Sequence, residues 1–219
     1  MRIVSANLAK GRVDLKAFLH LVQSVAADVV AVQEVTPAQA EALAAILPFG
    51  AIDAHSHRVG IALRQPGPVR RIPLPGRDAY VAEVAAGQPD AVVEVINVHI
   101  IAPHAGPPWR TAALRRGQVA GLEAHLARTA GQRLVLVGDL NATPMWPAYR
   151  RLCRHLSDGA QQAARLDHGR PHATWGPWGG LRLLRIDHVL VRRLRVDHVR
   201  VAHVPGSDHS AVVAEVHPA

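Results

Sequence analysis

The sequence predicts an α/β (α+β) protein in which two mixed β-sheets pack face to face between flanking helices. Two observations favour this class. Strand-like and helix-like segments alternate at the start of the chain, and several strand-like runs then follow one another without helices between them. A doubly wound parallel sheet is the rival fold, but parallel neighbours need crossover helices, which the middle of the chain lacks.

The first part of the chain contains two strand–helix pairs. Residues 2–7 form a strand-like run, and residues 14–25 follow with apolar side chains at helical spacing and an aspartate as candidate N-cap. The run DVVAVQE (28–34) predicts a buried strand. A helix over 37–47 comes next, since its proline is tolerated in a first turn.

The rest of the chain consists mainly of predicted strands. We expect three strands over 59–64, 80–84 and 91–99, then a long helix over 109–130 and a strand over 133–138. A helical stretch over 146–156, a two-stranded hairpin over 186–204 and a last strand over 211–216 should follow. In the hairpin, two antiparallel strands are joined by the turn RRLR. We expect one domain over residues 1–219, because this length suffices for one large core.

Composition narrows the class of protein. Hydrophobic residues make up 49% of the chain, no apolar run is long enough to span a membrane, and no signal peptide is expected. The single cysteine, Cys153, excludes an internal disulfide and predicts a reducing, cytoplasmic location. The net charge is +8, almost all of it from arginine. Arginine suits phosphate oxygens, although an Ala- and Arg-rich composition is also typical of a GC-rich genome.

Polar side chains stand where several predicted strands end. Asn7 and Glu34 end the first two strands, His99 and its neighbour Asn97 end a third, and the next runs into the sequence GDLN (138–141). A lone GDLN would be interpreted as an ordinary turn. Several polar strand ends in one chain indicate a site, because functional side chains gather at the carboxyl ends of strands.

Four Asp-His pairs lie in the last third of the chain, and the predicted hairpin distinguishes them. The start of its first strand lies beside the end of its second, so Asp187 should meet the PGSDHS loop and bond His209. Asp197 and His198 would lie roughly 15 Å away, at the turn, as a surface pair.

Two histidine-rich segments, 55–57 and 168–172, are interpreted as solvated loops, because their spacing matches no zinc site. The pair Asp167-His168 belongs to the second of them. The helix start at Trp109 and Arg110, together with Arg115 and Arg116, would either line the cleft or form a solvated helix face, and the second interpretation is favoured.

Six short motifs in order along nearly the whole chain resemble those of the endonuclease/exonuclease/phosphatase superfamily, which contains DNase I, exonuclease III, neutral sphingomyelinases and inositol-phosphate 5-phosphatases. The motifs are SANL, AVQEV, NVHIIAP, VGDLNAT, RIDHVLV and GSDHSAV. The resemblance implies a four-layer αββα sandwich of the DNase I type, in agreement with the strand pattern. It also implies a metal-dependent hydrolase of phosphoesters.

The resemblance implies which residues hold the metal. Asn7, Glu34 and Asp208 would lie at a divalent cation, Mg²⁺ or alternatively Mn²⁺. Carboxylate and water ligands suit such hard ions. The first motif departs from many members, which carry an aromatic residue where this chain has Ala6.

The resemblance also implies the catalytic roles. His209, oriented by Asp187, would act in acid–base chemistry or contact the scissile phosphate. Asp139 would orient or deprotonate the attacking water, and Asn141 with His99 would stabilise charge on the phosphoryl oxygens. The glutamate that supports the histidine in DNase-like members has no counterpart in 55–63, the region where we expect it.

Trp175, in the motif TWGPW (174–178), is a candidate substrate contact. It lies where related proteins often place an aromatic residue near the substrate, and it would stack on a base or sugar or pack along a lipid headgroup. The alternative is that it anchors its loop.

Three functions stay open. A DNA endonuclease or exonuclease is favoured by the net charge. A sphingomyelinase-like phospholipid phosphodiesterase, or a phosphatase for inositol phosphates or other small molecules, is favoured by a chain too short for large substrate-choosing insertions. A non-catalytic phosphate-binding protein is least favoured, since every central motif residue is present. We expect a monomer whose partner is the phosphoester substrate, nucleic acid in the first hypothesis.

Overall fold

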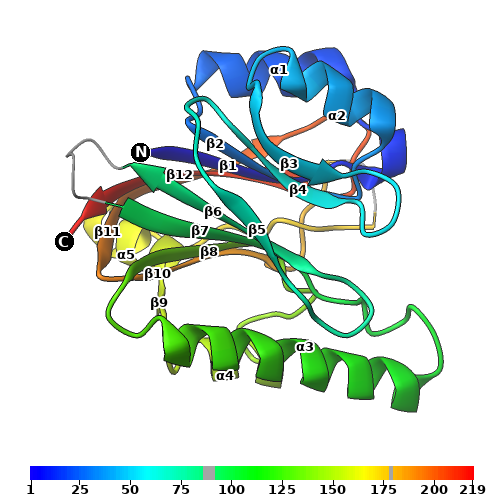
Figure 1. Ribbon diagram of the computed structural model, residues 1–219, viewed down its shortest axis with the longest axis vertical. Helices are drawn as coiled ribbons and strands as arrows, with labels where there is room; N and C mark the ends of the chain where they lie inside the picture. The colour runs from blue at the N-terminus through cyan, green and yellow to red at the C-terminus, as the bar shows by residue number, and fades with distance from the viewer. Residues whose placement is uncertain (86–91, 178–179) are drawn as a thin grey trace.

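A computed structural model describes residues 1–85, 92–177 and 180–219. Within these residues, two six-stranded sheets pack face to face and helices cover both outer faces (Figure 1). The layers run from α1 and α2 through the first sheet and the second sheet to α3 and α4. The predicted four-layer sandwich is confirmed.

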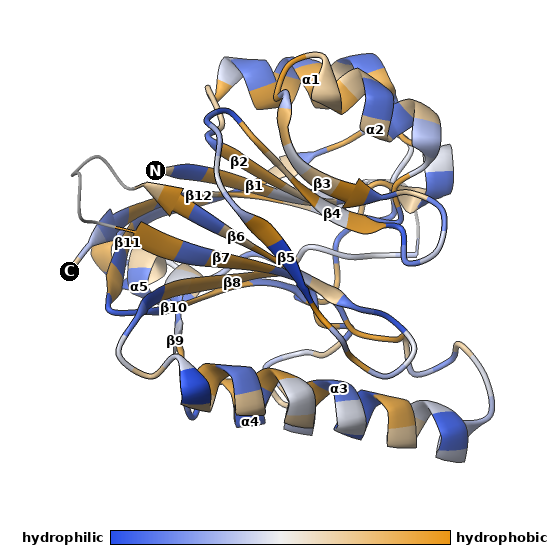
Figure 2. Cartoon of the chain, in the orientation of Figure 1, coloured by the Kyte–Doolittle hydropathy of each residue, from blue (hydrophilic) through white to orange (hydrophobic). Residues whose placement is uncertain are grey.

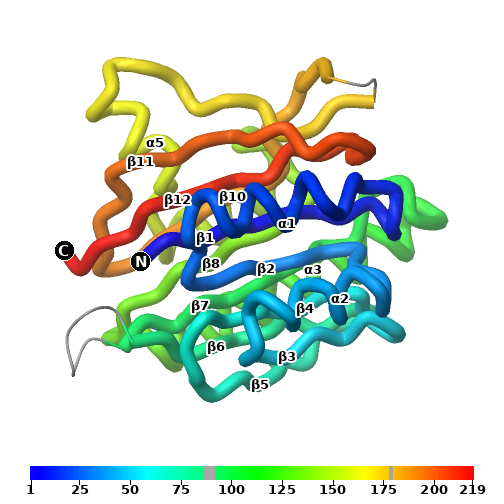
Figure 3. Tube along the Cα trace, turned by 90° about the horizontal axis from the view of Figure 1, so that it is seen from above, coloured from blue at the N-terminus to red at the C-terminus, as the bar shows by residue number. Residues whose placement is uncertain are grey.

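The first sheet contains the strands nearest both termini. Its order is β11-β12-β1-β2-β4-β3, with β1 parallel to β2 and antiparallel to β12. The strands span Arg2–Asn7 (β1), Val29–Gln33 (β2), Phe49–Asp53 (β3), Val59–Leu63 (β4), Leu194–His203 (β11) and Ser210–Pro218 (β12). Helices α1 (Leu15–Ser24) and α2 (Pro37–Ala44) lie over this sheet, as Figure 3 shows from above.

The second sheet has the order β5-β6-β7-β8-β10-β9, with β7 parallel and β10 antiparallel to β8. The strands span Val69–Ile72 (β5), Ala79–Ala85 (β6), Val92–His99 (β7), Arg133–Asp139 (β8), Ser157–Asp158 (β9) and Asp187–Arg192 (β10). The helices that follow β7, β8 and β9 are Pro108–Arg128 (α3), Pro147–Leu152 (α4) and Gly159–Leu166 (α5). Helix α5 packs mainly on β11 and β10, and a short 3-10 turn, Ala9–Gly11, follows β1.

Alternating apolar residues build three layers of core. One lies between the sheets, one beneath α1 and α2, and one beneath α3 and α4. Figure 2 shows largely apolar strands between helices that carry both hydrophilic and hydrophobic residues. Asn97 is a polar exception: it points from β7 into the sheet interface, where it donates to the carbonyls of Val32 (2.9 Å) and Gly60 (2.7 Å) and accepts from Gln33 (2.7 Å). Asn97 therefore joins the two sheets instead of entering a site.

The predicted hairpin over 186–204 is wrong. β10 pairs with β8 and β9 in the second sheet, whereas β11 pairs with β12 in the first, so the chain crosses between sheets at Arg193. Both strands direct apolar side chains into the same inter-sheet core, Val189 and Val191 from one and Leu194 and Val196 from the other. A crossing of this kind gives the same alternating pattern as a hairpin, which explains the error.

Four elements were not predicted from the sequence. β3, β5 and β9 are short, and β3 and β5 are exposed edge strands whose patterns are weak; α5 follows its N-cap Asp158 directly. Ala91, the first residue of the predicted strand 91–99, and Trp178, the last of TWGPW, lie outside the described residues. Among the described residues, no helix combines the length and apolarity needed to cross a membrane.

Candidate active site

Three predicted site residues lie in one row across the second sheet. His99 ends β7, Asp139 ends β8 and Asp187 begins β10, and the register pairs His99 with Asp139 and Asp139 with Asp187. Because β7 and β8 are parallel while β10 runs the opposite way, two strand ends and one strand start meet at the same edge. This edge presents one histidine and two carboxylates.

The first sheet brings further polar residues to the same edge. Asn7 ends β1 and donates through Nδ2 to Asp139 Oδ2 at 3.3 Å, which connects the two sheets. Glu34 follows β2, and Asp208 and His209 precede β12. A cleft of about 280 Å³ opens between these segments. Eight of the nine residues predicted from the sequence line it: Asn7, Glu34, His99, Asp139, Asn141, Trp175, Asp208 and His209.

The ninth predicted residue, Asp187, forms a hydrogen bond with His209 on the side of the ring away from the cleft. Its Oδ2 lies 2.9 Å and its Oδ1 3.1 Å from His209 Nδ1. The Thr174 hydroxyl donates to Asp187 Oδ2 at 2.6 Å and accepts from the Asp187 N–H at 3.1 Å, which fixes the carboxylate. With Nδ1 occupied, the ring has Nε2 left for the cleft, 3.8 Å from Asp139 Oδ2. The meeting predicted for Asp187 and His209 is thus present, although no hairpin produces it.

The two carboxylates and the imidazole shift one another's proton affinity. Burial and repulsion from Asp187 raise the pKa of Asp139 to about 7. Burial alone would lower the pKa of His209, but the charge and hydrogen bond of Asp187, with the charges of Asp139 and Asp208, raise it to about 9. At neutral pH, His209 is therefore a cation, and Asp139 is divided between its protonated and its ionised form.

The GDLN turn holds the Asp139 carboxylate in place. The Asn141 backbone N–H donates to Oδ1 at 2.7 Å and its Nδ2 donates to Oδ2 at 3.1 Å. Asn141 has a φ of 46°, a left-handed conformation that asparagine tolerates better than most residues. Gly138 has a φ of 129°, and a Cβ there would lie 2.0 Å from the Val98 carbonyl oxygen. The turn therefore requires glycine immediately before Asp139.

Asp208 is held from two sides. The Trp175 indole N–H donates to its Oδ2 at 3.0 Å, and the Arg12 guanidinium donates to its Oδ1 at 3.2 Å. The indole N–H of Trp175 is consequently occupied by a carboxylate. Its ring also lines the cleft, so the residue combines a loop-anchoring contact with an aromatic surface beside the site.

In the part of the chain that the structure describes, no carboxylate bonds the far side of the His99 ring. Within the described residues its Nδ1 is buried without a hydrogen-bond partner, and its Nε2 lies 3.5 Å from Asp139 Oδ2. Arg77, just before β6, donates to the His99 carbonyl oxygen at 3.4 Å. Burial, then the charges of Arg77, His209 and Lys10, lower the pKa of His99 well below its usual value. His99 is therefore neutral at physiological pH.

A family model matches most of the chain. The model described as "Endonuclease/Exonuclease/phosphatase family" matches residues 4–209, a span that contains all nine predicted site residues. The chain belongs to the endonuclease/exonuclease/phosphatase family. Enzymes of this family are metal-dependent phosphoesterases.

Solved structures share the fold of this family member. A conserved protein of unknown function from Enterococcus faecalis is 20% identical, with a TM-score of 0.75 and 100% of both chains covered. A humanized D. rerio TDP2 is 17% identical, with a TM-score of 0.75 over 99% of this chain and 98% of the other. Sphingomyelinase C from Streptomyces griseocarneus is 15% identical, with a TM-score of 0.64 over 98% of each chain. No curated protein matches the chain at a significant level.

The donors around the cleft fit a hard divalent cation. Glu34 and Asp208 supply carboxylates and Asn7 an amide oxygen, and oxygen is the donor that Mg²⁺ takes. Asp139, Asp187 and His209 bring candidate ligand atoms within 4.8 Å of one another, but the Asp187–His209 hydrogen bond already occupies both of those side chains. The oxygen atoms of Asn7, Glu34 and Asp208 therefore suit a metal better than the buried Asp187–His209 pair does.

Other residues singled out from the sequence lie apart from the cleft. Asp197 pairs with Arg195 at 2.7 Å and faces His217 at 3.5 Å, at the distant end of β11. His188 does not bond Asp187: its Nε2 lies 2.8 Å from the Ala142 carbonyl oxygen. The solvated-loop interpretation fits the exposed 168–172 segment, but His57 is half-buried, and its Nδ1 accepts from the Asp78 N–H at 3.1 Å.

Three residues of the site were missed in the sequence. Thr174 supports Asp187, Arg12 bonds Asp208, and Arg77 brings a cation near Glu34 and Asp139. Each stands in a loop or turn, where no periodic pattern marks it. The only signal was proximity: Thr174 precedes Trp175, and Arg12 follows the Asn7 motif closely.

Proposed function

We propose that this protein is a Mg²⁺-dependent phosphodiesterase that hydrolyses the phosphodiester bonds of DNA by in-line attack of water. The observation that carries the proposal is the buried Asp187–His209 pair, at 2.9 Å, whose ring faces the Asp139 carboxylate in a cleft lined with oxygen donors. A cationic imidazole and a carboxylate of raised pKa, set on either side of one space, suit proton transfer to and from a phosphoryl centre.

Asn7, Glu34 and Asp208 would hold the metal, Mg²⁺ or Mn²⁺. When bound, the ion would offset the negative charge of the phosphate and of the leaving oxygen. Arg12 and Trp175 keep Asp208 in place through one hydrogen bond to each carboxylate oxygen. These two residues would therefore set the position of a metal ligand.

Asp139 would orient the attacking water and accept its proton as the new P–O bond forms. Its raised pKa, about 7, suits a general base that works near neutral pH. His209, positively charged and oriented by Asp187, would bind a phosphoryl oxygen through Nε2–H or return a proton to the leaving oxygen as that bond breaks. Water is the nucleophile, so no covalent enzyme intermediate is needed.

The remaining residues would position the phosphate. Neutral His99 would donate to a phosphoryl oxygen, and Arg77 would add a positive charge on the same side. Asn141 would act by holding Asp139 in place, because its Nδ2 already donates to Asp139 and to the Ile100 carbonyl oxygen. Trp175 would offer its ring face to the substrate next to Asp208.

DNA is the substrate class that the charge supports. The net charge of +8 favours a polyanion, and a structural neighbour, D. rerio TDP2, was solved in complex with a single-strand DNA product. A phospholipid is the second candidate, because exposed Leu181, Leu183 and Leu184 lie in the loop beside the cleft and would suit an apolar surface. A monomeric enzyme working in the cytoplasm completes the proposal.

A substrate panel tests the proposed function. Purified protein with Mg²⁺ or Mn²⁺, and with EDTA as the control, would be incubated with plasmid DNA, single-stranded DNA, RNA, sphingomyelin, phosphoinositides and bis(p-nitrophenyl) phosphate. We expect metal-dependent cleavage of DNA and of the generic diester, lost in Asp139→Asn and His209→Ala, whereas Asp197→Asn, far from the cleft, stays active. Turnover of none of these compounds, or full activity of both cleft variants, would overturn the proposal.

A further inference from the structure

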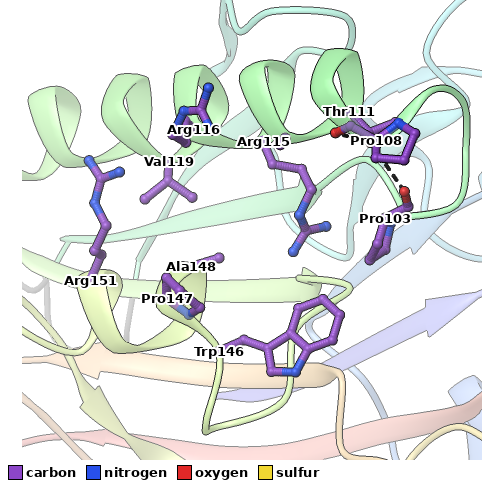
Figure 4. Close-up of a pocket in the computed structure, with 11 residues that line it drawn as sticks. Pro103, Pro108, Thr111, Arg115, Arg116, Val119, Trp146, Pro147, Ala148 and Arg151 are labelled. Atoms are coloured by element: carbon purple, nitrogen blue, oxygen red, sulfur yellow. Dashed lines mark hydrogen bonds between the residues drawn. The ribbon is translucent and has the colours of Figure 1, made fainter.

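A second hollow lies beside the catalytic cleft, between α3 and the segment that leads into α4. This groove has a volume of about 400 Å³. Its floor is apolar, formed by Val119, Pro147 and Ala148, and Figure 4 shows Arg115 reaching from α3 toward Trp146 across it. Pro103 and Trp146 line both the groove and the catalytic cleft, so the two hollows are adjacent.

Trp146 and Arg115 lie next to each other in this groove, and we call this pair the platform. The Arg115 guanidinium carbon lies 5.7 Å from the centroid of the Trp146 ring, within the range of a cation–π contact. Arg115 donates to the carbonyl oxygens of Ile101 and, at 3.0 Å, of Asn141. The platform is thus fixed to the backbone of a residue that also lines the catalytic cleft. The Trp146 side is open to solvent, with 41% of the residue exposed.

The charge of the groove selects its occupant. Arg115 is always ionised and Arg116 stands exposed at the α3 rim, whereas Arg151 at the far end is already neutralised by Glu123. An acyl chain laid against Arg115 would remove a charge from water without supplying an anion, which is unfavourable. A nucleotide suits the same surface, because a base stacks on an aromatic ring or a guanidinium and its phosphate pairs with arginine.

We infer that the groove between α3 and α4 is a nucleotide subsite in which the Trp146–Arg115 platform stacks a base of a single-stranded nucleic acid that continues from the catalytic cleft. The inference rests on the proposed function and specifies its substrate: a strand with an unpaired base next to the scissile phosphodiester. Base pairing would hide the face that the platform needs, so single strands or frayed ends bind better than an intact duplex.

The test is the affinity for a short fluorescein-labelled oligodeoxythymidylate, measured by fluorescence anisotropy in EDTA, which prevents cleavage. Loss of one stacking contact predicts that Trp146→Ala weakens binding by about tenfold or more, and that Trp146→Phe, which keeps an aromatic face, restores most of it. Arg116→Ala should weaken binding less and reduce the slope of log Kd against log salt by about one, the mark of one phosphate contact.

Matched controls separate the groove from general effects. Trp109→Ala removes another exposed tryptophan, one that lines neither hollow, and Arg200→Ala removes an exposed arginine from β11; both should bind as the wild type does. Wild-type affinity in Trp146→Ala would overturn the inference. So would Trp146-dependent binding of anionic phospholipid vesicles without binding of the oligonucleotide. Hydrolysis of bis(p-nitrophenyl) phosphate by the wild type is measured in parallel. If the wild type hydrolyses this diester, either of these two results counts against the groove and not against the proposed function.

Discussion

Replacing Asp187 by asparagine tests the assignment of His209 as the charged group of the cleft. The variant keeps the size of the side chain and an oxygen that can accept from His209 Nδ1, but removes the charge that lies 2.9 Å from the ring. A hydrogen bond between charged, buried partners contributes about 1.5–3 kcal/mol. At about 1.4 kcal/mol for each tenfold change in rate, kcat/KM should fall by about 10- to 150-fold.

The assay is the initial rate of metal-dependent hydrolysis of bis(p-nitrophenyl) phosphate, with a thermal unfolding curve to establish that the variant is folded. The loss of the Asp187 charge also lowers the pKa of His209 from about 9, so the variant should lose activity at a lower pH than the wild type as the imidazole deprotonates. Asp197→Asn, the matched exchange on β11, should leave the rate unchanged. A folded Asp187→Asn protein within about threefold of the wild type would refute the assignment.

Three further predictions concern stability. Glu94→Gln should lower the free energy of unfolding by about 1–3 kcal/mol at neutral pH, because Glu94 is buried and bonds His125 at 3.1 Å as well as Arg70. Burial alone would raise the pKa of Glu94, but these partners lower it. The stability that ionised Glu94 contributes is therefore complete above the unfolded-state pKa and is lost as the pH falls through the folded-state pKa. Urea titrations of the wild type and of Glu94→Gln should converge in acid. Asn97→Ala removes three hydrogen bonds between the sheets and should cost about 2–5 kcal/mol in the same titration, and a loss below about 1 kcal/mol would show that the sheets do not depend on them. Asp14→Ala removes the side-chain cap of α1 and should cost about 1 kcal/mol, seen as a lower Tm by circular dichroism, whereas an unchanged Tm would contradict the capping role.

Much of the fold was predictable because strands with one buried face alternate visibly. The strand over residues 2–7 and the long helix over 109–130 lie where their patterns indicate, within two residues. In contrast, the sequence did not predict which strand each strand pairs with. β10 and β11 alternate as a hairpin would, and nothing in the sequence reveals that Arg193 carries the chain from one sheet to the other.

The site residues, too, were predictable only in part. Residues in motifs, such as Asp139 and His209, could be named because their types and order resemble a known family. Residues whose importance comes from a contact could not: Thr174 matters through a 2.6 Å hydrogen bond to Asp187, and Arg115 through Trp146, thirty-one positions later. Such partners are brought together by packing, which local sequence patterns do not encode.

The interpretation of the helix bearing Arg115 and Arg116 as a solvated face is corrected by the same kind of contact. Arg115 is half-buried, and its guanidinium bonds two backbone carbonyls at the rim of the catalytic cleft. Helical spacing alone cannot distinguish an arginine in water from one that lines a groove, because both lie outside the apolar stripe.

The central claim is that a divalent cation held by this cleft supports the hydrolysis of phosphodiesters. Its most direct test is a Mg²⁺ titration of the initial rate of bis(p-nitrophenyl) phosphate hydrolysis by the wild type and by Glu34→Gln. We predict no activity in EDTA, recovery with added Mg²⁺, and a requirement for about tenfold or more Mg²⁺ for half-maximal rate in the variant, since a charged ligand has been lost. Hydrolysis that is indifferent to EDTA, or the same half-maximal Mg²⁺ concentration in both proteins, would contradict the claim.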